Sequence, residues 1–122
     1  AVITAAQTND IDLLDLGADA ASSGFYDKYP HFSKLTIPAG IYRGVDEART
    51  SFQDSALWVA NKDVSDQLVY DLLSVIYTDE GLAHMVSQKK TLKSMSISSG
   101  VTGIVTPLHP GAEKFWKEKG IL

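Results

Sequence analysis

Between Val64 and Tyr77 an apolar residue returns at every fourth position, and this spacing predicts an α-helix with one face in the core. The repeating residues are Val64, Leu68, Leu72 and Ile76. Further apolar residues widen the stripe: Val69, Leu73 and Val75. We expect Asp63 to cap the helix, since a carboxylate before the first turn accepts hydrogen bonds from backbone N–H groups.

A second helix is predicted immediately after the first. Thr78 precedes the acidic residues Asp79 and Glu80, an order typical of a helix start. Lys89 and Lys90 then suit a helix end, because the carbonyl end of a helix attracts positive charge. Two helices are therefore expected to meet near Thr78.

A last helix is predicted between Pro110 and Gly120. Proline is favoured just inside a helix start, and glycine is favoured just past a helix end. Glu113 and Lys117 stand four positions apart, which allows a stabilising ion pair on the helix surface. We expect His109 and Pro110 to build the start of this helix, with the imidazole or its backbone satisfying unpaired amide groups.

Short apolar or alternating runs indicate strands. Residues Phe32–Ile37 place Leu35 and Ile37 on one face and polar residues on the other, as a half-buried strand does. The runs Ile11–Leu16 and Ser55–Ala60 are short and mostly apolar, which favours buried strands. Strands interleaved with helices predict an α/β layer architecture.

The remaining segments give weaker signals. Ala18 to Tyr29 is rich in helix-forming alanine, with Gly24 weakening its centre and Pro30 ending it, so a helix is expected there. The stretch from Ile41 to Gln53 is charged and irregular and predicts no regular element. Residues 91–106 are rich in serine, threonine and glycine and are interpreted as a connector.

Composition excludes several classes of protein. The chain has 122 residues, a formal net charge of −4 and no cysteine. Such a length suits one domain with its own core, and an acidic chain lacks the basic field that nucleic acids or anionic membrane surfaces require. The absence of cysteine excludes disulfides, thiol catalysis and thiolate zinc sites. The longest apolar run, Ala56–Ala60, is far shorter than the ~20 residues that span a bilayer.

The titratable residues form no recognised catalytic or metal-binding motif. The histidines lack the close spacing of a zinc site: His31, His84 and His109. Two acidic clusters are interpreted as solvated loops rather than acid–base pairs: Asp10, Asp12 and Asp15, and Asp46 with Glu47. The sequence contains neither a G-x-S-x-G elbow nor a glycine-rich phosphate loop. We therefore expect no catalysis, no metal and no cofactor.

Two phrases resemble a known family. Ile37–Gly44 reads I-P-A-G-I-Y-R-G, and Pro107–Ile121 begins P-L-H-P-G-A-E. Both look like the best-marked segments in the C-terminal part of TAXI proteins, the extracytoplasmic solute-binding receptors of TRAP transporters, often called immunogenic proteins. Between them, Tyr29–Phe32 and the helix around Val69–Leu73 follow the order of the family. The similarity covers essentially all 122 residues.

The resemblance implies a type II periplasmic binding protein fold. Residues 1–122 would form its C-terminal portion, consisting of the second lobe, the crossover and the C-terminal helices, with the N-terminal lobe absent. Family members are expected to bind glutamate, glutamine, 2-oxoglutarate or a related carboxylate and to deliver it to TRAP membrane permease subunits. They are not enzymes and require no cofactor. The implied location is periplasmic or extracytoplasmic, after secretion by a signal peptide that is not present in this chain.

The resemblance also indicates candidate site residues. Tyr42 is expected to contact solute in the cleft, because it offers a hydroxyl beside an apolar ring; packing under the hinge is an equally weighted alternative. Residues 1–7 can be the end of a helix, and the resemblance implies that Thr4 faces the cleft from it. Gly40 and Gly44 are expected to act as a hinge that closes the lobes. The alternative function is an autonomous interaction domain without ligand binding, in which exposed faces pair between chains and cause self-association.

Overall fold

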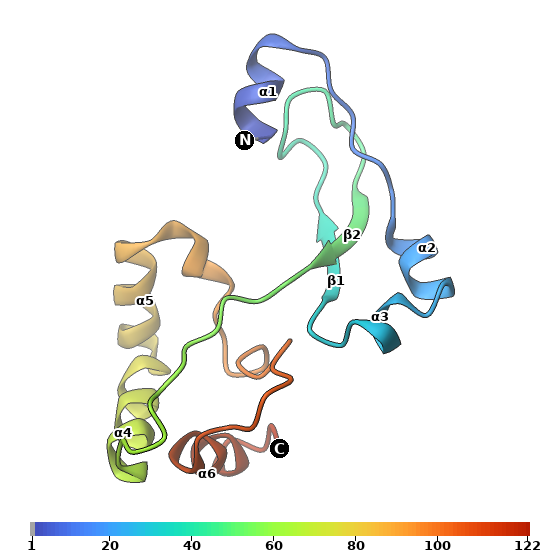
Figure 1. Cartoon of the computed structure of the whole chain (residues 1–122). Helices are drawn as coiled ribbons and strands as arrows, with labels where there is room; N and C mark the ends of the chain where they lie inside the picture. Colours follow the sequence, from blue (N-terminus) through green and yellow to red (C-terminus); the bar gives the residue numbers. More distant parts are fainter. Residues whose placement is uncertain (1) are drawn as a thin grey trace. The chain divides into compact units, whose positions relative to one another are not determined.

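The computed structural model describes residues 2–122 and divides the chain into two units, Ala1–Ser55 and Ala56–Leu122. Helices occur in both units, and the sheet formed by the described residues has two strands (Figure 1). The chain is therefore a small mixed α/β protein, as the interleaved sequence pattern predicts.

The first unit contains short helices and a β-hairpin. Its elements are α1 (Val2–Thr8), α2 (Gly17–Ser22), α3 (Phe25–Lys28), β1 (Ser33–Ile37) and β2 (Arg49–Gln53). The strands pair antiparallel, with Ile37 opposite Arg49 (Figure 1). The strand predicted at Phe32–Ile37 is confirmed, and half-buried residues alternate with exposed ones along β1. β2 falls in the stretch for which the sequence predicts no regular element. That prediction is wrong at β2, because its polar residues hide the alternation of polar and apolar side chains that indicates a strand.

The helix predicted between Ala18 and Tyr29 is interrupted. It forms as α2 and α3, and the break falls at Gly24, whose φ of 71° lies in the left-handed region that a right-handed helix does not admit. Aromatic packing then fixes α3 on the hairpin. The ring centroid of Phe25 lies 5.2 Å from that of Phe32 and 4.6 Å from that of Phe52.

The strand predicted at Ile11–Leu16 is wrong. This segment runs beside β2 without forming a ladder: Leu16 N donates to Thr50 O at 3.0 Å, and Arg49 Nε donates to Leu13 O at 3.0 Å. One of these two bonds comes from a side chain instead of the backbone. Some of the backbone hydrogen-bonding groups of residues 11–16 are thus paired with side-chain groups of β2. These residues therefore do not need a neighbouring strand to satisfy them.

The second unit is helical. Its elements are α4 (Asp66–Ile76), α5 (Asp79–Gln88), the 3₁₀-helix η1 (Lys90–Ser94) and α6 (Pro110–Glu118). The three predicted helices are confirmed. The cap of α4 is Ser65 rather than Asp63, since the Ser65 hydroxyl accepts from Leu68 N at 3.3 Å. Thr78 caps α5 as predicted, and its hydroxyl accepts from Gly81 N at 3.0 Å.

The core of the second unit lies between α4 and α6. Its buried residues are Leu73, Phe115 and Trp116. Half-buried side chains surround them: Val69, Tyr70, Tyr77, Ile97, Val101, Leu108, Ala112 and Ile121. The predicted core stripe of α4 is thus confirmed at Val69 and Leu73 and wrong at Leu68 and Leu72, which are 60% and 52% exposed. The aromatic rings of α6 pack on the face of α4 that carries Tyr70, and Tyr77 at the end of α4 joins them.

Both ends of α6 are closed by hydrogen bonds. At its start His109 Nδ1 accepts from Gly111 N at 3.3 Å, while His109 Nε2 bonds Val64 O at 3.0 Å, which confirms the predicted capping role. At its end Gly120 N donates to Lys117 O, and Ile121 N donates to Trp116 O, each at 3.0 Å. These two bonds form a Schellman motif, and the φ of 71° at Gly120 fits it.

The strand predicted at Ser55–Ala60 is also wrong. These residues have no regular structure, and Val59 is 90% exposed. A short apolar run satisfies the pattern of a buried strand, but it becomes one only where another strand supplies backbone partners. Residues 91–106 contain η1 and a series of turns, consistent with a connector.

Candidate functional site

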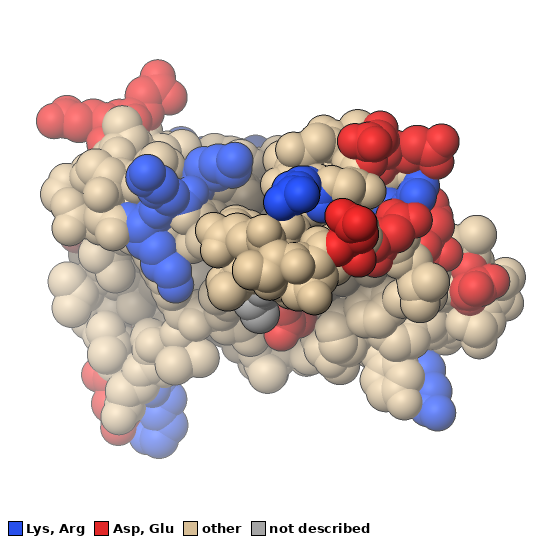
Figure 2. Space-filling view, turned by 90° about the horizontal axis from the view of Figure 1, so that it is seen from above, with Lys and Arg blue, Asp and Glu red and all other residues tan. Residues whose placement is uncertain are grey.

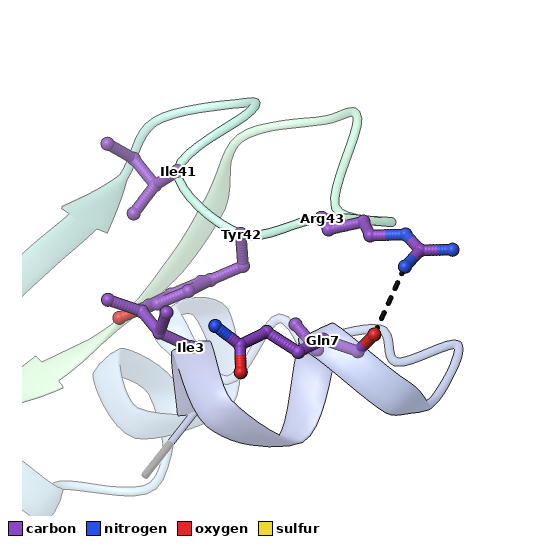
Figure 3. A pocket seen from close by; sticks show the side chains of 6 residues that line it. Ile3, Gln7, Ile41, Tyr42 and Arg43 are labelled. Atoms are coloured by element: carbon purple, nitrogen blue, oxygen red, sulfur yellow. Dashed lines mark hydrogen bonds between the residues drawn. The ribbon is translucent and has the colours of Figure 1, made fainter.

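The candidate site is an open hollow in the first unit, where α1 faces the loop between β1 and β2. Its volume is about 240 Å³. The lining residues are Ile3, Ala6, Gln7, Ile41, Tyr42 and Arg43. Figure 3 shows the Tyr42 ring pointing from the loop toward Ile3 of α1. The site therefore brings one face of α1 together with a loop about 35 residues later in the chain. The hydrogen bond from Arg43 to Gln7 O, 36 positions apart, makes the same connection.

A folded loop presents Tyr42 and Arg43. Gly40 N donates to Val45 O at 2.8 Å, and Val45 N donates to Tyr42 O at 3.1 Å. Val45 is fully buried and anchors the loop. Gly40 and Gly44 have φ values of 74° and 86°, which favour glycine at both turning points. The intervening side chains are thereby directed toward α1.

Arg43 is the charged group of the hollow. Its Nη1 donates to Gln7 O at 3.2 Å, near the carbonyl end of α1 (Figure 3). Within residues 2–122 no carboxylate lies at salt-bridge distance from Arg43. A guanidinium has five N–H donors in a fixed planar fork that matches a carboxylate. Together with the Tyr42 ring and Ile3, it gives the hollow one cationic edge and an apolar wall.

The sequence-predicted site residues are partly brought together. Tyr42 is half-buried and lines the hollow. Thr4 is exposed on α1 and is not one of the lining residues. Gly40 and Gly44 lie in the β1–β2 loop that carries Tyr42, and a Cβ on Gly44 would meet Ile11 O at 2.9 Å. Their role as a hinge stays a prediction.

Sequence reasoning missed Ile3, Gln7 and Arg43. Ile3 and Gln7 are spaced four apart, which places them on one face of α1. Arg43 directly follows Tyr42. The combination of this helical spacing with the charged residue of the I-P-A-G-I-Y-R-G phrase is the signal that could have identified them.

A second polar network holds the chain beside β2. Arg49 donates to Asp12 at 3.0 Å and to Glu47 at 2.8 Å, and the Thr50 hydroxyl donates to Asp15. Bonding to Arg49 lowers the pKa of Asp12, and bonding to Thr50 lowers the pKa of Asp15. The solvated-loop interpretation of Asp12 and Asp15 is therefore incomplete, because both carboxylates fasten residues 12–15 to β2.

On the face drawn in Figure 2, uncharged side chains cover most of the surface, with acidic and basic groups between them. Among residues 2–122, no three His, Asp or Glu side chains are grouped closely enough to hold a metal ion. In the same residues, no helix is both long and apolar enough to cross a bilayer.

The sequence matches one family over nearly its whole length. The match is to the NMT1-like family and covers residues 1–120. It agrees with the solute-binding character that the sequence phrases imply, and it includes the α1 face, the β1–β2 loop and α6. The relationship therefore suggests a small molecule as the partner. The chain belongs to the NMT1-like family.

Proposed function

We propose that this chain serves in a TAXI-type extracytoplasmic receptor that binds a small carboxylate and delivers it to TRAP permease subunits. Glutamate, glutamine and 2-oxoglutarate are the proposed solutes. Binding proceeds without chemical conversion, a metal or a cofactor. Family membership supports the solute-binding role. The I-P-A-G-I-Y-R-G and P-L-H-P-G-A-E phrases support the finer assignment.

The observation that carries the proposal for a carboxylate is Arg43 at the edge of an apolar hollow. Its guanidinium contacts a backbone carbonyl of α1 and retains donors that the Gln7 bond does not use. Tyr42 adds a phenol hydroxyl beside its ring. A carboxylate would accept from Arg43, while its apolar carbons would pack on Tyr42 and Ile3.

Thermal unfolding with each solute tests this function. A ligand present at 100 times its dissociation constant should raise the free energy of unfolding by about 2.7 kcal/mol. We expect a rise with at least one carboxylate and none with its uncharged amide or alcohol counterpart. An unchanged transition with every carboxylate would contradict binding by this chain.

Substitution of Arg43 tests the proposed contact. Arg43→Gln should weaken the bound carboxylate about tenfold to a hundredfold, because a hydrogen bond to a charged group contributes about 1.5–3 kcal/mol. Lys28→Gln, which removes another cation of the first unit, is the matched control and should leave the affinity unchanged. If Arg43→Gln and Lys28→Gln lowered the affinity for the carboxylate equally, the net charge of the chain alone would account for the effect.

A second candidate function, self-association without ligand binding, is favoured by the outer face of α4. Leu68, Leu72 and Val75 are exposed there at spacings of four and three, as in the seam of paired helices. Multi-angle light scattering would then give a dimer, and Leu72→Glu would give a monomer. Gln67→Glu, on the same helix, is the control. A monomer at all concentrations would contradict this alternative.

A further inference from the structure

A second hollow in the first unit is lined by residues of α2, α3, β1 and β2. Its volume is about 180 Å³, and it shares no lining residue with the hollow at Tyr42. The side chains that bear on its chemistry are Ala21 of α2, Tyr26 of α3, Lys34 and Thr36 of β1, and Thr50 of β2. We propose that it binds a small organic anion with a short apolar body.

The Tyr26 hydroxyl favours a bound hydrogen-bond acceptor. Its oxygen is buried, and it has no hydrogen-bond partner among the described residues. A buried hydroxyl without a partner costs folding free energy, so such groups are uncommon unless something else satisfies them. Tyr26 lines the hollow. After a small movement of the groups that cover it, this hydroxyl would donate its proton to an oxygen atom of a bound molecule.

The lining of this hollow contains a positive charge on β1. Lys34 and Thr36 are exposed residues of β1 two positions apart, so both lie on one face of the strand. Lys34 has no salt-bridge partner within residues 2–122. No carboxylate lines the hollow. The Thr50 hydroxyl donates to Asp15, which lies outside the lining, so this hydroxyl is already used. Among the lining residues Lys34 is the charged one, which favours an anion.

The hollow is small and partly apolar. The volume of about 180 Å³ is below the roughly 300–1,000 Å³ of pockets that hold drug-sized ligands, so the hollow suits a small molecule. Ala21 and Leu35 contribute apolar lining. Butyrate has a carboxylate for Lys34 and Tyr26 and a three-carbon chain for the apolar part, which makes it a suitable probe.

The test is an NMR titration of the whole chain with butyrate and, separately, with butan-1-ol. Butyrate should shift the methyl signals of Ala21 and Leu35 and should bind at least about tenfold more tightly than the alcohol, because only butyrate is charged. Equal affinities would overturn anion recognition. Unchanged methyl signals at about 100 mM butyrate, where even a millimolar site is filled, would overturn the site.

Two substitutions locate the contacts. Tyr26→Phe should weaken butyrate about tenfold, and Lys34→Gln about threefold. Tyr29→Phe is the control, since Tyr29 is exposed and does not line the hollow. Tyr26→Phe removes a hydroxyl that has no protein partner, so the unliganded variant should keep or raise its melting temperature. Butyrate affinity unchanged by both substitutions would overturn the assignment.

One further comparison separates this site from the proposed receptor function. Arg43→Gln should weaken the binding of glutamate or 2-oxoglutarate about tenfold to a hundredfold and leave butyrate binding intact, because the two hollows share no lining residue. Loss of butyrate binding in this variant would show that butyrate occupies the hollow at Tyr42 instead, and the second site would be rejected.

Discussion

At Gly111 the absence of a side chain decides how closely α6 approaches α4. A Cβ at this position would lie 2.1 Å from the carbonyl oxygen of Asp66, a backbone atom that cannot rotate away. We expect Gly111→Ala to lower the free energy of unfolding by about 1–3 kcal/mol, because α6 must shift. Urea denaturation followed by the fluorescence of the buried Trp116 measures this loss.

Gly120→Ala provides the comparison. Gly120 has a φ of 71° and nothing within 4 Å of its virtual Cβ, so the change adds backbone strain without a collision. We expect a loss of about 1 kcal/mol. If Gly111→Ala cost no more than Gly120→Ala, close packing of the helices would not be the reason for glycine at position 111.

Residue-level chemistry could be predicted from the sequence in favourable cases. His109 and Thr78 were identified as capping residues because caps depend on neighbours in sequence. The phrase that contains Tyr42 indicates this residue, which lines the hollow; its contact with solute stays a prediction. Arg43 and Gln7 were missed because their contact joins residues 36 apart, and nothing local to either one indicates the other.

Among the elements, the segment beside β2 depends on pH. Arg49 and Thr50 lower the pKa values of Asp12 and Asp15 in the folded protein. A carboxyl with a lowered folded pKa stabilises the fold above its unfolded pKa, about 3.9, and this contribution is lost as the pH falls through the folded value. The free energy of unfolding should therefore decline as the pH falls below about 4.

The double variant Asp12→Asn/Asp15→Asn tests this dependence. Its free energy of unfolding should fall less steeply than that of the unchanged chain as the pH is lowered, and its N–H groups at residues 13–16 should exchange faster at neutral pH. Asp27→Asn, at an exposed acid of α3, is the control. Parallel pH curves for the double variant and the unchanged chain would disprove the role of Asp12 and Asp15.

Elements with strong local signals were predictable, and elements that depend on distant partners were not. The spacing of the apolar residues predicts the range of α4. It does not determine which face of α4 is buried, because apolar residues occupy most of the helix circumference. Contact with Phe115 decided the face. The runs Ile11–Leu16 and Ser55–Ala60 have strand composition, yet neither forms a strand, because pairing needs a backbone partner that composition does not reveal.

For the whole molecule, the division at Ser55 predicts a site of easy cleavage. Leu57 and Trp58 are exposed in a segment without regular structure, the kind of backbone that proteases enter first. Chymotrypsin at low concentration should cut after one of these residues and give two fragments, which mass spectrometry identifies. First cleavage after the buried Phe115 would contradict this division.

The hydrogen bond between His109 and Val64 has a kinetic consequence. It joins groups 45 positions apart, whereas α4 and α5 are consecutive in the chain. Closing a long loop costs more chain entropy than closing a short one, so contacts of small sequence separation form earlier. We therefore expect α4 and α5 to associate first and α6 to dock last. The aromatic core of the second unit would then be the final part of it to exclude water.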